Sequence, residues 1–146
     1  MLVLDTDHVS LLDWGTGAEY ASLRARLAGA APRQIATTIV TFEEQSRGWL
    51  ATTARAQTRS RSYQLDAYAR LLTHLENYRL RRVMPFDEKA SDEFERLRLA
   101  RIRVGTMDLR IASIALAHGA TLLSRNLIDF RRVPGLDVQD WISLPP

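Results

Sequence analysis

The sequence contains no cysteine, and this absence narrows both its chemistry and its compartment. Disulfides, thiolate catalysis and cysteine-ligated zinc are excluded, and the chain is compatible with a reducing cytoplasm. The longest apolar runs fall far short of the ~20 residues that a membrane span needs. The N-terminus, MLVLDTDHVS, has an acid at position 5 and no basic segment before a long apolar stretch, so we expect no secretory signal. Together these absences predict a cytoplasmic protein that does not enter a membrane.

Lysine is almost absent, because Lys89 is the only one and arginine supplies nearly all of the positive charge. The formal net charge is +3 at pH 7. A mildly basic chain can favour polyanions, and a solvated, arginine-rich surface explains the same composition equally well. The length of 146 residues suits one domain, and we find no repeat, linker or second domain. We therefore expect a single domain over residues 1–146.

Short apolar and β-branched runs alternate with stretches of helical periodicity along the chain. Strands are predicted at 2–4, 35–40, 81–86 and 120–124, with an edge strand within 138–146. Helices are predicted at 19–28, 42–50, about 63–78, 87–103 and 107–118, with Thr41 and Thr106 as two of the N-caps. This alternation predicts an α/β/α sandwich around a central parallel sheet of about four to five strands.

Two of the predicted helices carry apolar stripes. The secondary structure of segment 52–62 is ambiguous. That arginine-rich segment suits a helix, a mobile loop or both. The stretch 63–78 places four residues on one stripe, and 87–103 is expected to face inward with Phe94, Leu97 and Ile102. The residues of the first stripe are Leu65, Tyr68, Leu72 and Leu75.

Acidic and amide side chains follow the ends of several predicted strands. Asp5 ends the first strand, and Glu43 and Glu44 follow the second. Asp108 lies in the first turn of a helix, and Asn126 and Asp129 follow the strand at 120–124. Because ligands bind beyond the carboxyl ends of parallel strands, these groups can converge on one edge. Carboxylate oxygens suit Mg²⁺ or Mn²⁺, which can activate water and polarise a phosphoryl group.

Each of these acids also has an ordinary structural explanation. Asp5 could cap the turn after its strand, and Asp129 could be a loop residue. One of Glu43 and Glu44 could be a solvated acid at a helix start, and Asp108 could stabilise its own helix dipole. The metal-site interpretation therefore depends on the recurrence of acids at equivalent strand ends, and not on any single member.

Three segments of the chain form a recognisable ordered set. They are LDTDHVS at the start, TTIVTFEEQSRGW in the first half, and GTMDLRIASIALAHGATLLSRNLIDFRRVPGLDVQDW near the end. In this order they resemble the PIN domain. They are most similar to the toxin branch of that family, the VapC-type ribonucleases of bacterial toxin–antitoxin pairs. The resemblance covers essentially the whole chain, although residues 52–103 carry little signature.

The resemblance implies three catalytic, metal-binding acids. The family's first acid falls on Asp5 and its third on Asp108, with Thr106 as a hydroxyl neighbour. The second falls on Glu44 and not on Glu43, because the family has this acid four residues before a glycine, here Gly48.

The resemblance also implies auxiliary positions at the same site. A fourth, often acidic, position falls on Asn126, which adds no charge. Asp129 could substitute for it, and Asp7, where the family often has asparagine, could offset the missing charge. The family activity implied is metal-dependent endoribonuclease, in which a metal-activated water attacks the phosphate and no protein nucleophile is needed. The implied partners are RNA, a cognate antitoxin protein and a second copy of the chain in a homodimer.

Several other residues have weaker functional interpretations. Arg125, Arg131 and Arg132 are candidates for RNA phosphates, as is a second strip formed by Arg55, Arg59 and Arg61. For each arginine a solvated surface role is an equal alternative. Turn, packing or helix-end roles are favoured for His8, His74 and His118, and packing is favoured over base stacking for Trp14, Trp49 and Trp141. Apolar residues near Tyr20 and Trp49 suit either a partner groove or the core.

Other functions remain open at this level. LVLDTD resembles the opening of haloacid-dehalogenase-type phosphatases, but that family continues with Gly-Thr and needs a later lysine. Here His8 and Val9 follow, and Lys89 is the only lysine. A nonenzymatic RNA- or protein-binding module with a decayed site is a second alternative, and a nuclease acting on structured DNA is a third.

Overall fold

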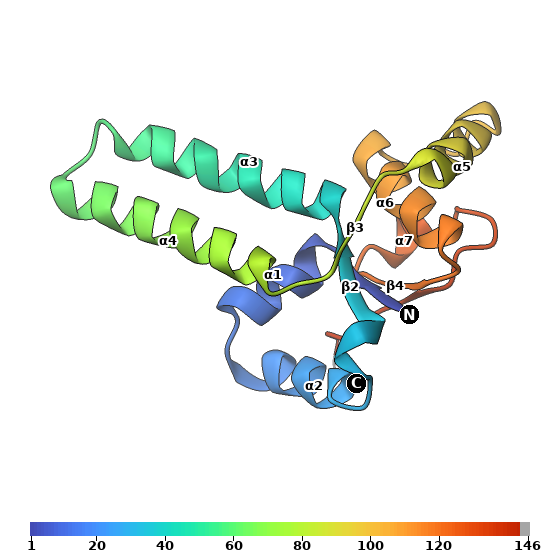
Figure 1. The fold of residues 1–146 in the computed structure, drawn as a ribbon, viewed down its shortest axis with the longest axis horizontal. Helices are drawn as coiled ribbons and strands as arrows, with labels where there is room; N and C mark the ends of the chain where they lie inside the picture. Colours follow the sequence, from blue (N-terminus) through green and yellow to red (C-terminus); the bar gives the residue numbers. More distant parts are fainter. Residues whose placement is uncertain (144–146) are drawn as a thin grey trace.

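The computed structural model describes residues 1–143 and contains one five-stranded parallel sheet (Figure 1). The strand order is β3-β2-β1-β4-β5, which confirms the expected α/β class with a central parallel sheet. The strands are β1 (Leu2–Leu4), β2 (Ile35–Thr38), β3 (Val83–Met84), β4 (Thr121–Leu123) and β5 (Val138–Gln139). The last three residues of the predicted edge strand lie outside the described part of the chain.

Seven helices accompany the sheet in residues 1–143. They are α1 (Thr6–Trp14), α2 (Gly17–Leu27), α3 (Ile39–Ala56), α4 (Arg61–Arg79), α5 (Glu88–Leu99), α6 (Thr106–Ala117) and α7 (Leu127–Phe130), with a 3-10 turn at Pro32–Gln34. None of the helices in this part of the chain is long and apolar enough to cross a membrane.

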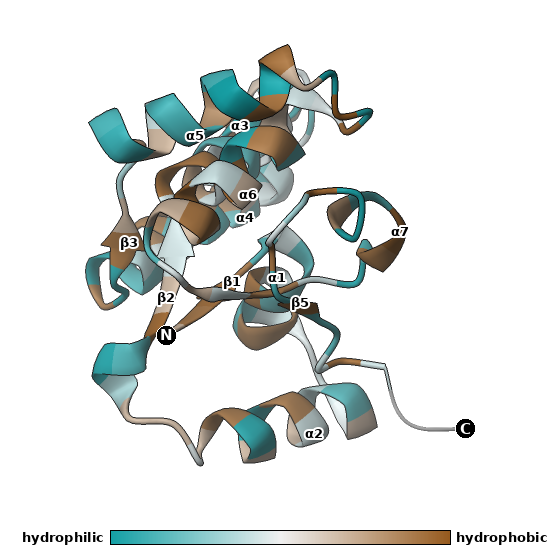
Figure 2. Ribbon diagram, turned by 90° about the vertical axis from the view of Figure 1, so that its right-hand side faces the viewer, coloured by the Kyte–Doolittle hydropathy of each residue, from teal (hydrophilic) through white to brown (hydrophobic). Residues whose placement is uncertain are grey.

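The sheet separates two apolar cores because successive side chains of a strand point to opposite faces. Val3 and Leu122 belong to one buried cluster, whereas their neighbours Leu4 and Leu123 belong to the other. The first core is filled mainly by α6, with α5 packed over it, and α1 and α2 cover the second. Figure 2 shows this layering, with α5 and α6 on one side of the strands and α2 on the other.

The parallel register places the carboxyl ends of the three central strands together. Leu4 of β1 lies opposite Thr37 of β2 and Leu123 of β4. The residues that follow these positions therefore leave the sheet at one edge, and α1, α3 and the β4–α7 connection all begin there. This shared edge is where the candidate site is formed.

Helices α3 and α4 form a hairpin that projects from the sheet (Figure 1). The ambiguous segment 52–62 contains the last turns of α3, a short turn and the start of α4. The stripe on α4 is largely solvent-exposed; Leu72, for example, is 55% exposed. Periodicity alone shows that such residues share a face, and within residues 1–143 that face stays more than half exposed.

Three local predictions were wrong at helix starts. Helix α1 was missed. It starts directly after strand β1, and Asp5 is its N-cap, whose side chain accepts a hydrogen bond from the backbone of Thr6. The N-cap of α3 is Thr38 and not Thr41, since the Thr38 hydroxyl accepts from the Thr41 backbone. Thr106 is the first residue inside α6, and the N-cap is Gly105. In each case the chain turns into the helix earlier than the apolar pattern indicates.

Candidate active site

Asp5 lies at the centre of the shared sheet edge and is almost fully buried. Its Oδ1 accepts from the backbone of Thr6 at 2.7 Å, and its Oδ2 accepts from the Ser124 hydroxyl at 2.7 Å. Burial raises the pKa of Asp5 from 3.8 to about 6, and the negative charges of Asp7 and Asp108 add to the effect. The fold therefore holds a carboxylate where its charge is poorly solvated, so a nearby cation would be favourable.

Glu44 reaches the same edge from the second turn of α3. The hydroxyl of Thr6 donates to Glu44 Oε2 at 2.6 Å, which joins α1 to α3 at the residue that follows Asp5. Its neighbour Glu43 points elsewhere and forms an exposed ion pair with Arg47 at 2.5 Å. Of the two adjacent glutamates, only Glu44 has a side chain bonded to the residue that follows Asp5.

Asp108 enters from the first turn of α6 and is bonded to Asn126. Asn126 Nδ2 donates to Asp108 Oδ2 at 3.1 Å and to Asp129 Oδ2 at 3.1 Å. Partial burial, followed by the charges of Glu44 and Asp129, raises the pKa of Asp108. The neutral amide of Asn126 thus donates hydrogen bonds to both carboxylates, which offsets part of the repulsion between Asp108 and Asp129.

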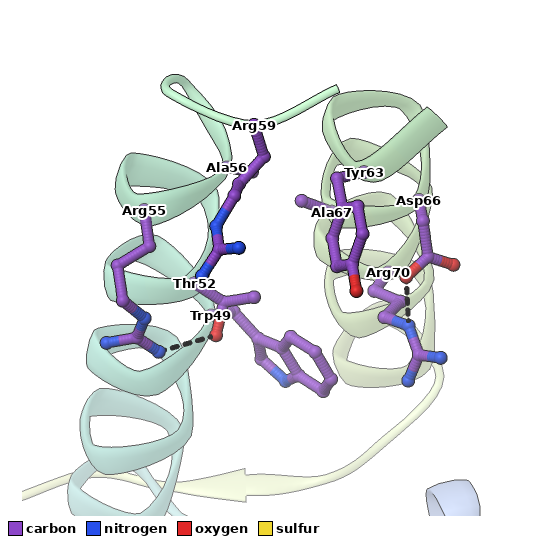
Figure 3. Close-up of a pocket in the computed structure, with 9 residues that line it drawn as sticks. All are labelled: Trp49, Thr52, Arg55, Ala56, Arg59, Tyr63, Asp66, Ala67 and Arg70. Atoms are coloured by element: carbon purple, nitrogen blue, oxygen red, sulfur yellow. Dashed lines mark hydrogen bonds and ion pairs between the residues drawn. The ribbon is translucent and has the colours of Figure 1, made fainter. Parts of the chain in front are cut away.

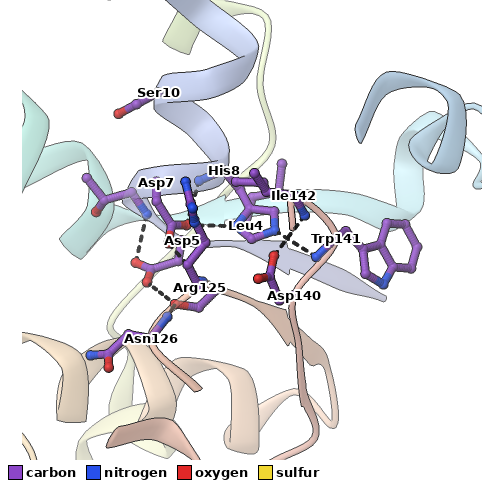
Figure 4. A network of polar contacts seen from close by, with 12 residues as sticks. Leu4, Asp5, Asp7, His8, Ser10, Arg125, Asn126, Asp140, Trp141 and Ile142 are labelled. Atoms are coloured by element: carbon purple, nitrogen blue, oxygen red, sulfur yellow. Dashed lines mark hydrogen bonds and ion pairs between the residues drawn. The ribbon is translucent and has the colours of Figure 1, made fainter. Parts of the chain in front are cut away.

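Asp7 is turned toward the backbone and not toward the other acids. Its Oδ1 lies 2.7 Å from Nδ1 of the buried His8, and its Oδ2 accepts from the backbone of Arg125 at 2.8 Å (Figure 4). His8 Nε2 in turn accepts from the Trp141 backbone at 3.3 Å. Asp7 and His8 therefore tie α1 to the chain after β4 and β5, and the charge of Asp7 acts on Asp5 from a distance.

The donor set suits a hydrated, hard cation. Within residues 1–143, no three Asp, Glu, His or Cys side chains lie close enough to enclose an ion by themselves. Four acids nevertheless lie close enough to influence one another. The charge of Asp108 raises the pKa of Asp5, and the charges of Glu44 and Asp129 raise the pKa of Asp108. Mg²⁺ typically keeps several waters and uses one or two carboxylates with substrate phosphate oxygens. The site fits that mode and does not resemble a closed all-protein cage.

Two contributors to this site were not identified from the sequence. Ser124 is fully buried, donates to Asp5 and accepts from the Asn126 backbone at 3.0 Å. Thr6 holds Glu44. The only sequence signal for Ser124 is a hydroxyl closing the apolar strand that precedes Asn126, and such a residue also suits a turn. Thr106 is exposed and makes no side-chain hydrogen bond in the described part of the chain.

The candidate arginines separate into two groups around the site. Arg125 lies 4.0 Å from Glu19, and Arg132 pairs with Asp129 at 3.2 Å, while Arg131 is exposed. Arg55 and Arg59 line a hollow between α3 and α4, and Arg61 starts α4 outside that hollow.

The other histidines and the tryptophans make packing contacts. His74 stacks on Phe42 with ring centroids 5.6 Å apart, and burial lowers its pKa. His118 ends α6 and lies 3.7 Å from Asp87. The tryptophan contacts include Trp14 with Trp49 at 5.1 Å between ring centroids and the Arg26 guanidinium 4.9 Å from the Trp141 ring centroid. Arg70 lies over the ring of Trp14 at 5.7 Å.

Three solved structures share this fold along nearly the whole chain. VapBC-1 of nontypeable Haemophilus influenzae superposes with a TM-score of 0.71 at 20% identity, covering 97% of this chain and 98% of that one. VapBC2 of Rickettsia felis, bound to a DNA fragment from its promoter, gives 0.70 at 22% identity, covering 96% and 98%. FitAcB of Neisseria gonorrhoeae gives 0.69 at 20% identity, covering 99% and 100%. At these identities the likeness establishes the fold alone.

Sequence similarity to characterised proteins is higher but short. The chain is 50% identical over 38 residues to ribonuclease VapC1 of Rickettsia felis and 45% identical over 38 residues to ribonuclease VapC2 of the same organism. Each match spans 26% of this chain and 28% of the relative. The family model for the PIN domain matches residues 3–136. With the sheet, the acidic edge and this match in agreement, the chain belongs to the PIN-domain family.

Proposed function

We propose that the chain is a metal-dependent endoribonuclease that hydrolyses RNA phosphodiester bonds, acting as the toxin of a toxin–antitoxin pair. The observation that supports this proposal is a chain of hydrogen bonds that links Asp5, Glu44 and Asp108 along one sheet edge through Thr6, Ser124 and Asn126. Burial and the charges of neighbouring acids raise the pKa of Asp5 and Asp108 there. Family membership and the short match to proteins named ribonuclease VapC1 and VapC2 support the choice of reaction.

In this proposal Asp5, Glu44 and Asp108 hold Mg²⁺ or Mn²⁺ together with water and phosphate oxygens. When bound, such an ion supplies Lewis acidity, which acidifies water and offsets the charge of the phosphate. Ser124 fixes the orientation of Asp5, and Thr6 fixes that of Glu44.

Asn126 holds Asp108 and Asp129 at a set spacing and adds no further negative charge. Asp129 is thus an auxiliary residue that reaches the site through this amide. Asp7 contributes charge. Thr106, exposed at the first position of α6, is an auxiliary residue whose hydroxyl can contact the substrate. No protein side chain forms a covalent intermediate in this reaction.

The phosphatase alternative receives less support. A haloacid-dehalogenase-type site needs a lysine beside the nucleophilic aspartate, and Lys89 is exposed on α5. In the described residues Lys89 forms no ion pair with any carboxylate. Both oxygens of Asp5 also accept hydrogen bonds that hold the side chain within the fold.

The proposed partners follow from the family and from exposed surface. The structurally similar proteins include VapBC and FitAcB, and one match is described as a toxin–antitoxin complex from Klebsiella pneumoniae. Helix α4 presents exposed apolar side chains that a partner protein can cover. We propose a cognate antitoxin and a homodimer as the partners, and a cytoplasmic location, which the lack of a candidate membrane helix within residues 1–143 accommodates.

The test is cleavage of end-labelled cellular RNA by the purified protein, with Mg²⁺ or Mn²⁺ against excess EDTA. We expect metal-dependent cuts that Asp5→Asn removes and that Glu43→Gln retains, because Glu43 is an equally acidic neighbour that faces Arg47. Loss of cleavage in both variants would mean that cleavage depends on the overall negative charge of the protein and not on Asp5 in particular. Labelled structured DNA and a small phosphomonoester are included as substrates, and turnover of either in preference to RNA would replace the proposed activity. RNA binding without cleavage in any metal would favour a nonenzymatic module.

A further inference from the structure

Two adjoining hollows lie along the α3–α4 hairpin. One has a volume of about 400 Å³ and includes Thr6 and Gly48 in its lining. The other has a volume of about 330 Å³ and lies between the two helices (Figure 3). Trp49, Thr52 and Arg55 line both hollows, which therefore lie next to each other. We call the two hollows together, from Thr6 to the far end of the second hollow, the hairpin groove.

The groove begins beside the carboxylates. Thr6, at its near end, donates its hydroxyl to Glu44. Glu44 and Arg55 lie on the same helix, and their separation in sequence corresponds to roughly 16 Å along the helix axis. At about 3.4 Å per stacked nucleotide of one strand, that distance spans about five nucleotides. The groove is thus long enough to hold several nucleotides that adjoin a phosphate at the carboxylates.

The far part of the groove is cationic, whereas the near part is lined mostly by uncharged side chains. Its lining contains Arg55, Arg59 and Arg70 and one acid, Asp66. Arg70 is paired with Asp66 at 2.9 Å. Over residues 1–143, neither Arg55 nor Arg59 forms an ion pair, and Arg55 donates only to the Thr52 hydroxyl at 3.2 Å. Two guanidinium groups are therefore available for phosphate oxygens, which they bind well in bidentate geometry.

Aromatic rings accompany these cations. Tyr63 lines the groove and is 63% exposed, with the Arg59 guanidinium 5.9 Å from its ring centroid. Trp49 lines both hollows, and its ring centroid lies 5.1 Å from that of Trp14, which lines the near hollow. Aromatic faces stack on unpaired bases with little preference for sequence, and arginine planes add to that stacking. Cations beside exposed aromatic rings are typical of a surface for single-stranded nucleic acid.

We propose that the hairpin groove binds single-stranded RNA on one side of the cleaved phosphate, with Arg55 and Arg59 on the backbone and Tyr63 as a stacking surface. This inference rests on the proposed ribonuclease function and adds the path of the substrate to it. A single strand is specified because base stacking on Tyr63 needs an unpaired base, whereas a duplex keeps its bases stacked on each other.

The test measures binding of a labelled single-stranded RNA in an Asp5→Asn background, which prevents cleavage. Arg55→Ala/Arg59→Ala is compared with Arg96→Ala/Arg98→Ala, a control that removes the same charge from exposed positions on α5. Since each neutralised phosphate of a single strand contributes about 0.7 to the slope of log K against log salt, the groove variant should lose about 1.4 of slope and bind roughly tenfold more weakly. The control should keep the parent slope. Equal slopes in both double variants would overturn the proposal.

A second pair of variants tests the stacking surface. Tyr63→Leu should weaken binding by about fivefold or more, because stacking of one base on an aromatic ring contributes at least about a factor of five. Tyr63→Phe keeps the ring and should bind as the parent does. The exposure of Tyr63 makes either change harmless to the fold. Equally weakened binding in both variants, or unchanged binding in both, would show that the ring of Tyr63 does not stack on the RNA.

Cleavage assays separate this inference from the function on which it rests. RNA cleavage by the wild type with an unchanged KM in Arg55→Ala/Arg59→Ala would overturn the groove and leave the ribonuclease standing. Groove-dependent RNA binding without metal-dependent cleavage would support the groove and overturn the ribonuclease. A duplex RNA, or an acidic peptide, that binds more tightly than the single strand and depends on the same two arginines would overturn the assignment of the occupant.

Discussion

The carboxylate edge and the α3–α4 hairpin are built in opposite ways from neighbouring segments of one chain. At the edge, Asp5 is 7% exposed, Ser124 is fully buried, and their contacts join residues more than a hundred positions apart. On the hairpin, Leu72 and Tyr63 are mostly exposed. Many side-chain hydrogen bonds there join residues three or four positions apart. The edge has acids held in fixed positions, whereas the hairpin offers cations and apolar side chains to the solvent.

This contrast indicates a division of labour within the molecule. A site that holds a cation against a phosphate needs side chains fixed by further hydrogen bonds. A surface that meets a long substrate or another protein needs area, charge and exposed rings instead. Helix α3 serves both regions, since Glu44 lies near its start and Arg55 near its end. Substitutions in the two regions should therefore affect different measurements.

The largest effect is expected at the carboxylate edge. Asp108→Asn should lower the rate of metal-dependent RNA cleavage by more than about a hundredfold, because even residues that only orient metal ligands typically cost 10–100-fold. Asp129→Asn, which reaches the site through Asn126, should fall within that smaller range. Rates under single-turnover conditions measure both. Equal losses in the two variants would make Asp129 a full member of the metal site.

The next effect concerns the base of the hairpin, where Arg81 forms two hydrogen bonds to the buried carboxylate of Asp13, one of them 2.9 Å long. Arg81→Ala leaves that carboxylate without its partner, so the free energy of unfolding should fall by about 3 kcal/mol. Arg70→Ala removes an exposed partner of Asp66 and should cost below about 1 kcal/mol. Urea denaturation compares the two. Similar values would mean that the hairpin is not anchored through Arg81.

Asp5→Asn should raise stability while it abolishes cleavage. The pKa of Asp5 is raised in the fold, so folding favours the protonated form of its side chain. The resulting contribution to the free energy of unfolding is complete below about pH 4 and is lost as the pH rises through 6. The shift corresponds to up to about 3 kcal/mol. Because asparagine gives up one acceptor for Thr6 or Ser124, a net gain of about 1–2 kcal/mol is expected above pH 7.

Thermal unfolding in EDTA at several pH values measures this difference. The advantage of Asp5→Asn should shrink as the pH falls from 7 toward 4. Added Mg²⁺ should raise the Tm of the wild type more than that of the variant. A difference between the two proteins that does not change with pH would contradict the ionisation of a buried Asp5 as its cause.

The smallest effect on stability is expected on the exposed face of α4. Leu72→Glu should change the free energy of unfolding by less than about 0.5 kcal/mol, because the side chain is already in solvent. It should nevertheless reduce self-association if the apolar face contacts a second copy, which analytical ultracentrifugation measures. Ala69→Glu, an exposed charge change on the same helix, is the matched control. A large loss of stability would show that the face is covered within the monomer.

Much of the architecture could be predicted from local patterns, and the departures have physical causes. The apolar runs 2–4 and 120–124 became central strands, and the periodicity of 107–118 became the buried helix α6. The start of α3 was placed too late, because β-branched Ile39 and Val40 favour a strand in isolation while the Thr38 cap and the packing of Val40 favour the helix. Helix α1 was missed because DTDHVS has turn-like composition until Asp5 caps it.

The sequence by itself determined the chain order of the strands and of five helices, together with the acids that follow Leu4, Thr38 and Val104, because strand and helix periodicities are local properties. It did not reveal the short helices α1 and α7. Tertiary structure alone decided that Ser124 holds Asp5, that Asn126 bridges Asp108 and Asp129, and that the α4 stripe faces solvent. Such contacts depend on which strands are neighbours and on what covers a helix face. Periodicity fixes which residues share a face, but only the packing of distant segments decides what that face meets.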